Sequence, residues 1–189
     1  MSSNIQPLVP GYIYHVFNRA IGNEKLFIKE EDHLKWIEFF KKYVLPLCEL
    51  YAYCLLPNHY HLLLRLNFET PAVDFSKAMS DSANSFSKWY NKEYKRKGSL
   101  FIRPFKRKLI EDDHQLAWTA WYIHRNPLHH GYTIDWSSWK FSSFQMFLSE
   151  KPTALTRNFI LDFFGNKEEL VRHHNLNADE TMLNLIAIE

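Results

Sequence analysis

The chain has 189 residues, a formal net charge of +2, and 46% hydrophobic and 16% aromatic residues. This length and composition predict one folded domain with an appended segment and exclude a disordered chain. We expect neither a signal peptide nor a membrane span, because no apolar run reaches the roughly 18 residues that a spanning helix needs. The two cysteines, Cys48 and Cys54, lack metal or redox spacing, which favours a reduced, cytoplasmic protein.

The predicted elements alternate between strands and helices over the first 110 residues. Aromatic and β-branched runs bounded by Gly, Pro and Asn are typical of strands, and apolar residues three and four apart behind a group of acids are typical of helices. These patterns predict a strand over 11–19, a helix from Glu30 to Val44, strands over 49–56 and 59–66, a helix from Pro71 to Gly98 and a strand over 101–110. The order β-α-β-β-α-β predicts an α+β fold with a ferredoxin-like antiparallel sheet and both helices on one face.

A further helix and a mostly helical extension are expected after this unit. Asp112 and Asp113 predict the start of a helix from His114 to Asn126, and Pro127 predicts its end. Later helices are predicted over 157–164, 167–175 and 178–188. We therefore expect one domain over 1–131 and an extension over 132–189 that packs on it.

Two histidines one residue apart suggest a site for chemistry. His59 and His61 lie in the predicted strand 59–66, where alternation places both imidazoles on one face. Such a pair makes a preorganised bidentate metal site, although two ordinary half-buried histidines are the plainer interpretation. On the later helix, Tyr122 and Asn126 are four residues apart and share one surface. An amide oxygen from Asn126 could add a ligand, and a phenol held near a bound cation can attack phosphorus.

Basic residues are concentrated in one short stretch. Residues 92–108 contain eight Lys and Arg against one acid, Glu93, which indicates a local basic patch suited to phosphate contacts. A solvated helix end is the alternative interpretation. Among the other histidines, we interpret His15 as a hydrogen-bonded sheet residue rather than a third ligand. The pairs 129–130 and 173–174 are interpreted as surface residues.

Four runs of the sequence resemble one family. They are YHVFNR at 14–19, LPNHYHLLL at 56–64, GSLFIRPF at 98–105 and YIHRNP at 122–127. In this order they resemble the single-tyrosine HUH transposases (Y1, IS200-like), and they are most similar to the REP-associated tyrosine transposase branch. The run WKFSS at 139–143 loosely matches a downstream element of that branch, so the resemblance covers roughly residues 11–145.

The resemblance implies a nuclease domain over 1–131, a reaction and a set of site residues. It implies Mg²⁺ or Mn²⁺ held by His59 and His61, with Asn126 where relatives carry a Gln or Asn ligand. It also implies Tyr122 as the nucleophile that cleaves single-stranded DNA beside a hairpin, giving a 5′-phosphotyrosine and a free 3′-OH. A monomer or a homodimer, associated with the nucleoid when on DNA, is expected. The candidate DNA-binding residues are Arg19, Lys95, Arg103, Lys106, Arg107 and Arg125.

Two other functions stay open at this point. A replication-initiator or relaxase type of HUH nickase would use similar chemistry. Relaxases usually place the tyrosine before the histidines, whereas Tyr122 follows them here. A non-catalytic ferredoxin-like module that binds nucleic acid would need neither the metal nor Tyr122.

Overall fold

Four antiparallel strands form one sheet in the order β2-β3-β1-β4 in the computed structural model, which describes residues 6–178. The antiparallel sheet of the predicted α+β fold is confirmed, and β1 is a central strand between β3 and β4. The strands are β1 Ile13–Arg19, β2 Cys48–Leu56, β3 His59–Leu66 and β4 Lys106–Leu109.

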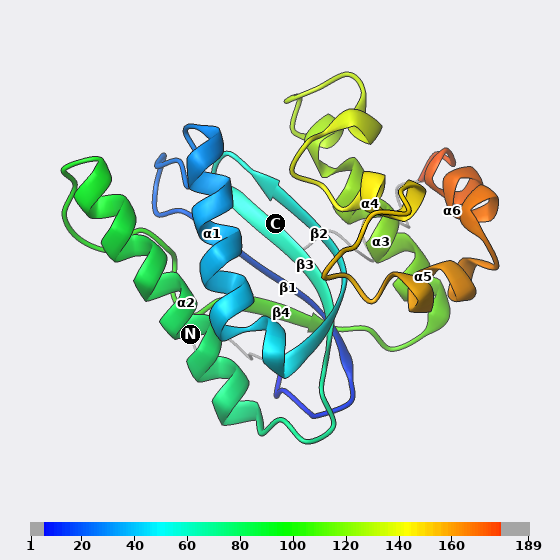
Figure 1. Ribbon diagram of the computed structural model, residues 1–189, viewed down its shortest axis with the longest axis horizontal. Coiled ribbons are helices and arrows are strands. Elements are labelled where there is room, and N and C mark those ends of the chain that lie inside the picture. Colours follow the sequence, from blue (N-terminus) through cyan, green and yellow to red (C-terminus); the bar gives the residue numbers. More distant parts are fainter. Residues whose placement is uncertain (1–5, 179–189) are drawn as a thin grey trace.

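The helices form two groups around this sheet. Figure 1 shows α1 and α2 in front of the strands, whereas α3 to α6 lie together beyond β2. None of the helices within residues 6–178 combines the length and apolar character needed to cross a bilayer. The helices are α1 Glu30–Tyr43, η1 Leu45–Leu47, α2 Ala72–Glu93, α3 Asp113–His129, η2 Trp136–Ser138, α4 Phe144–Leu148, α5 Arg157–Phe164 and α6 Lys167–His174. The helix predicted over 178–188 falls almost entirely outside the described residues.

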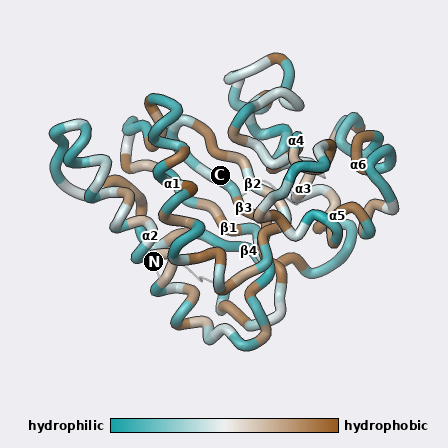
Figure 2. Tube along the Cα trace, in the orientation of Figure 1, coloured by the Kyte–Doolittle hydropathy of each residue, from teal (hydrophilic) through white to brown (hydrophobic). Residues whose placement is uncertain are grey.

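The main core lies between the sheet and the α1–α2 pair. Tyr60 of β3 points to this side, with its ring 4.8 Å from that of Trp36 on α1. Phe75 and Phe86 of α2 are also fully buried, as their helical spacing predicted. Each buried side chain of this kind contributes roughly 1.5–3 kcal/mol to the free energy of folding. The core between the sheet and the two helices therefore makes the sheet a rigid support. Figure 2 shows hydrophobic colour in parts of the other strands, whereas β4 and the free end of α2 are mainly hydrophilic.

Three predicted boundaries were wrong. The strand predicted over 101–110 is regular only over Lys106–Leu109, because Pro104 cannot donate to a ladder. The helix predicted to reach Gly98 ends at Glu93, since Lys95 has a left-handed φ of 50° that cannot continue it. The helix predicted to end before Pro127 continues to His129, with Pro127 in its last turn, and the His130 N–H donates to the Asn126 carbonyl at its end.

Residues from the C-terminal part of the chain cover the outer edge of β2. The Leu55 N–H donates to the Phe141 carbonyl (2.9 Å), and the Tyr53 N–H donates to Ser143 Oγ (2.9 Å). Further along the strand, the Thr156 N–H donates to the Leu50 carbonyl (2.8 Å). An uncovered edge would leave such groups open to pairing with another chain. The domain division after residue 131 remains a prediction.

Candidate functional site

The two histidines of β3 occupy the sheet face opposite α1 and α2. The register pairs His61 with Phe17 and His59 with Arg19 of β1, so these four side chains share that face. The two imidazole centroids are 5.0 Å apart, and both side chains are buried. The predicted common face of His59 and His61 is confirmed.

Helix α3 lies against this face and brings two further predicted residues to the histidines. Asn126 Oδ1 is 3.0 Å from His59 Nε2. The ring of Tyr122, one helical turn earlier, lies edge-on to the ring of His61 with centroids 5.6 Å apart. Both α3 side chains are buried. The structure therefore places all four predicted residues in one cluster, although about 60 residues separate the strand from the helix.

Hydrogen bonds orient both imidazoles. His15 Nε2 on β1 lies 2.9 Å from His61 Nδ1, and Asn58 Oδ1 lies 2.7 Å from His59 Nδ1. The interpretation of His15 as a hydrogen-bonded sheet residue is confirmed, but its contact with His61 was not predicted. Partners of this kind fix the tautomer and ring direction of a metal-binding histidine. The sequence signal for this contact was the histidine at position 15 of the neighbouring strand, but its contact with His61 could be predicted only with the strand register.

The donor atoms of this cluster fit a divalent cation. An ion with octahedral ligands at about 2.0–2.1 Å has neighbouring ligand atoms about 3 Å apart. The 3.0 Å between His59 Nε2 and Asn126 Oδ1 matches that spacing. In the part of the chain that the structure describes, no group of three or more His, Cys, Asp or Glu side chains is suited to a metal ion. An amide oxygen beside two imidazoles is therefore the donor set that this site offers.

Two candidate DNA-binding residues flank the histidines. Arg19 is exposed and lies directly across from His59, and Lys106 is exposed with its ammonium 5.9 Å from the ring of Phe17. Both line a small cavity of about 60 Å³ together with the two histidines. A phosphate that entered this cavity would meet positive charge on two sides.

The other candidate DNA-binding residues differ in their surroundings. Lys95 and Arg103 are exposed, and Arg103 donates to Asn84 Oδ1 on α2. Arg107 is half-buried and donates to the Gln6 carbonyl (2.6 Å). Arg125 is half-buried and donates to the His174 carbonyl (2.8 Å). Lys95 and Arg103 thus present their charge to solvent, whereas the last two are also tied to neighbouring segments.

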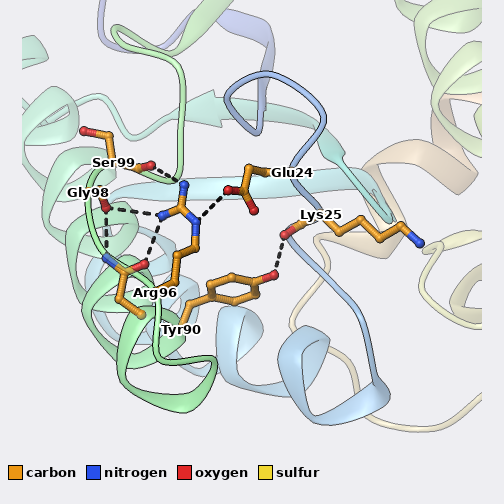
Figure 3. A network of polar contacts seen from close by, with 7 residues as sticks. Glu24, Lys25, Tyr90, Arg96, Gly98 and Ser99 are labelled. Carbon is orange, nitrogen blue, oxygen red and sulfur yellow. Dashed lines mark hydrogen bonds and ion pairs between the residues drawn. The ribbon is translucent and has the colours of Figure 1, made fainter.

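A salt-bridged arginine holds the basic turn that follows α2. Figure 3 shows Arg96 between Glu24 and the backbone of the turn, with Nε 2.8 Å from Glu24 Oε1 and Nη2 2.7 Å from the Ser99 carbonyl. On the same side, the Tyr90 hydroxyl donates to the Lys25 carbonyl (2.7 Å). Arg96 therefore serves the fold, and it fixes the segment that displays Lys95.

Behind α3 lies a buried imidazole pair that was not predicted. His124 Nδ1 is 2.8 Å from His174 Nε2, and His124 Nε2 is 2.8 Å from Ser143 Oγ. The prediction that His174 lies on the surface is wrong, because α6 packs this side chain against α3. His129 and His130 are exposed as predicted, and the ring of His130 lies 4.6 Å from that of His59.

Comparisons with known proteins agree with this arrangement. Residues 9–126 match the family model described as "Transposase IS200 like". A Haemophilus influenzae protein assigned by name to the REP-associated tyrosine transposases is 32% identical over 123 residues, which cover 58% of this chain and 69% of that protein. A solved structure of a REP-associated tyrosine transposase bound to a REP hairpin shares the fold, with a TM-score of 0.66 and 20% identity over 80% of this chain and 89% of that one. The chain belongs to the IS200-like, single-tyrosine family of DNA transposases.

Proposed function

We propose that this protein is a metal-dependent transposase that cleaves and rejoins single-stranded DNA beside hairpins through a phosphotyrosine at Tyr122. One observation carries the proposal. The phenol of Tyr122 and the amide of Asn126 on α3 meet the imidazoles of His59 and His61 on β3. A passive binding surface has no use for this combination.

The imidazoles and the amide are the proposed holders of Mg²⁺ or Mn²⁺. A divalent cation bound there would polarise the phosphodiester and neutralise charge on its oxygens. His61 is oriented by His15 and His59 by Asn58. Since β1 and β3 are central strands of the sheet, the two imidazoles are held rigidly before any DNA arrives.

Tyr122 is the proposed nucleophile, and one attack accounts for both products. Its hydroxyl oxygen forms a bond to phosphorus, the bond from phosphorus to the 3′ oxygen breaks, and the phenol proton passes to solvent. The leaving oxygen takes up a proton and becomes a free 3′-OH, while the 5′ phosphate stays on Tyr122. Attack of a 3′-OH on this phosphotyrosine reverses the step, so rejoining needs no nucleotide cofactor.

Single-stranded DNA with a hairpin is the proposed substrate. Support comes from the cations around the histidines, Arg19 and Lys106, and from the REP hairpin bound by the solved relative. Tyr122 lies against His61, and Asn126 against His59, within one copy of the chain. This arrangement supports cleavage by a single copy, in a monomer or in a homodimer.

The test uses hairpin-bearing single-stranded oligonucleotides from the repeats that flank the gene, incubated with protein and Mn²⁺ and separated on a denaturing gel. We expect a covalent protein–DNA adduct that disappears with a chelator and in Tyr122→Phe. Tyr12→Phe is the matched control, because this exposed tyrosine precedes β1 at the end away from His59 and should leave the adduct unchanged. Tight binding without metal and without any adduct would contradict the proposal and favour a passive binding module.

A further inference from the structure

A cavity on the α2 face of the sheet adjoins the proposed cleavage site, which lies on the other face. It has a volume of about 550 Å³ and lies between α2, the sheet and the segment that leads into β4. Asn18 and Ile102 line both this cavity and the small cavity at His59 and His61. A strand whose phosphate lay at the histidines could therefore place a neighbouring base in the larger cavity.

The walls of this cavity have the chemistry that a nucleobase requires. The aromatic side chains of Tyr60, Phe101 and Phe105 contribute to its lining, and such rings stack on bases of any sequence. The hydroxyl-bearing residues Ser76 and Ser80 of α2 also line it. Cavities of this size that combine an apolar lining with a few polar groups are typical of small-ligand sites.

The charge around the cavity matches a nucleotide rather than an uncharged apolar ligand. Arg103 and Arg107 both line it, and the Arg107 guanidinium lies 5.4 Å from the ring of Phe105. Arg103 is exposed and is directed along α2 by its bond to Asn84. Guanidinium groups at such an opening can pair with the phosphates on either side of an inserted base.

We propose that this cavity, here called the base pocket, binds one extruded nucleobase of the strand that is being cleaved. The proposal rests on the proposed function, because it assumes a single strand at His59 and His61. It adds a second point of attachment, so the pocket would set the distance between the recognised base and the cleaved bond. Removal of that base should weaken binding about tenfold, the effect of losing one stacked base.

The experiment is a double-mutant cycle of protein and DNA, measured by fluorescence anisotropy in the full-length Tyr122→Phe background without divalent metal. Each nucleotide beside the hairpin is replaced in turn by an abasic one. Ala83→Trp fills the pocket from α2, and Ser80→Phe fills it from a more exposed position. Val73→Trp, an exposed site on α2 that does not line the pocket, is the control.

The expected result is one abasic position that weakens binding about tenfold in the Tyr122→Phe background and in the control, but has no effect in either pocket-filling variant. If every abasic position weakened binding as much in the filled variants as in the Tyr122→Phe background, the base pocket would be overturned. The adduct of the cleavage assay would then still support the proposed function. Conversely, an abasic position whose effect disappears in the filled variants, together with no adduct in the cleavage assay, would support the base pocket and overturn the proposed cleavage.

Discussion

At the scale of single residues, the contact between His15 and His61 has a testable consequence. His15 holds His61 through a 2.9 Å hydrogen bond and lies on the neighbouring strand. Since such partners fix the direction of a ligand, His15→Ala should weaken Mn²⁺ binding about 10- to 100-fold, measured by calorimetry. His15→Gln, which keeps a hydrogen-bonding side chain, should recover part of the affinity. Equal affinity in all three proteins would show that His15 has no part in the site.

The buried histidine of α6 predicts how stability depends on pH. Burial lowers the pKa of His174 from 6.5 to about 4, the hydrogen bond to the Leu170 carbonyl opposes this shift, and the nearby His173 and Arg125 add to it. Because the unfolded chain binds a proton here below pH 6.5, the free energy of unfolding should fall as pH drops from about 6.5 to 4, by roughly 3 kcal/mol from this residue.

His174→Gln should therefore unfold more easily at pH 7 but show a flatter pH dependence between pH 6.5 and 4 in urea titrations. His114→Gln changes an exposed imidazole on α3 and serves as the control, with a dependence like that of the parent protein. A parent-like slope in His174→Gln would mean that the imidazole of α6 is not buried in solution. His33, whose pKa burial also lowers to about 4, and His124, whose pKa burial lowers well below 6.5, still contribute a slope in His174→Gln, so the measured quantity is the difference from the parent protein.

At the scale of elements, α3 matters most because it carries both Tyr122 and Asn126. Its first turn is fixed by Asp112, whose carboxylate accepts from the Gln115 N–H at 2.7 Å. Asp112→Ala should cost about 1 kcal/mol and lower the melting temperature by roughly 2–4 °C. Glu111→Ala, one residue earlier, keeps the capping carboxylate and should melt like the parent. Identical melting of both variants would show that this cap contributes nothing.

Much of the site could be predicted from two local periodicities and the family resemblance. Alternation along a strand placed His59 and His61 together, and four-residue spacing on a helix placed Tyr122 and Asn126 together. What could not be predicted depends on register and packing. The contact from His15 to His61 requires the pairing of β1 with β3, which a single sequence does not reveal.

The same limit explains the predictions that were wrong. His174 was predicted to lie on the surface because it has no partner residue at strand or helix spacing, whereas its burial depends on α6 meeting α3. The long strand predicted over 101–110 followed side-chain type, but only Lys106–Leu109 finds a regular partner in β1. Local propensity located the elements, and tertiary contacts decided where they begin and end.

At the scale of the whole molecule, the segment after residue 131 completes the edge of the sheet. It supplies partners for the Tyr53 and Leu55 amides of β2, and Ser143 and His174 bond to His124 on α3. A chain truncated after residue 131 would expose a strand edge and leave buried polar groups unpaired. We therefore expect it to aggregate on size-exclusion chromatography. A monodisperse truncated protein with the parent's circular dichroism would show that this part folds without the segment.

The most direct test of the central claim is to find which atom of the protein carries the DNA. The adduct formed with Mn²⁺ and a hairpin oligonucleotide is digested with trypsin and nuclease, and the modified peptide is sequenced by mass spectrometry. We expect a nucleotide 5′-phosphate on Tyr122 and a free 3′-OH on the released strand. A nucleotide on another of the ten tyrosines, or attached through its 3′ end, would contradict it.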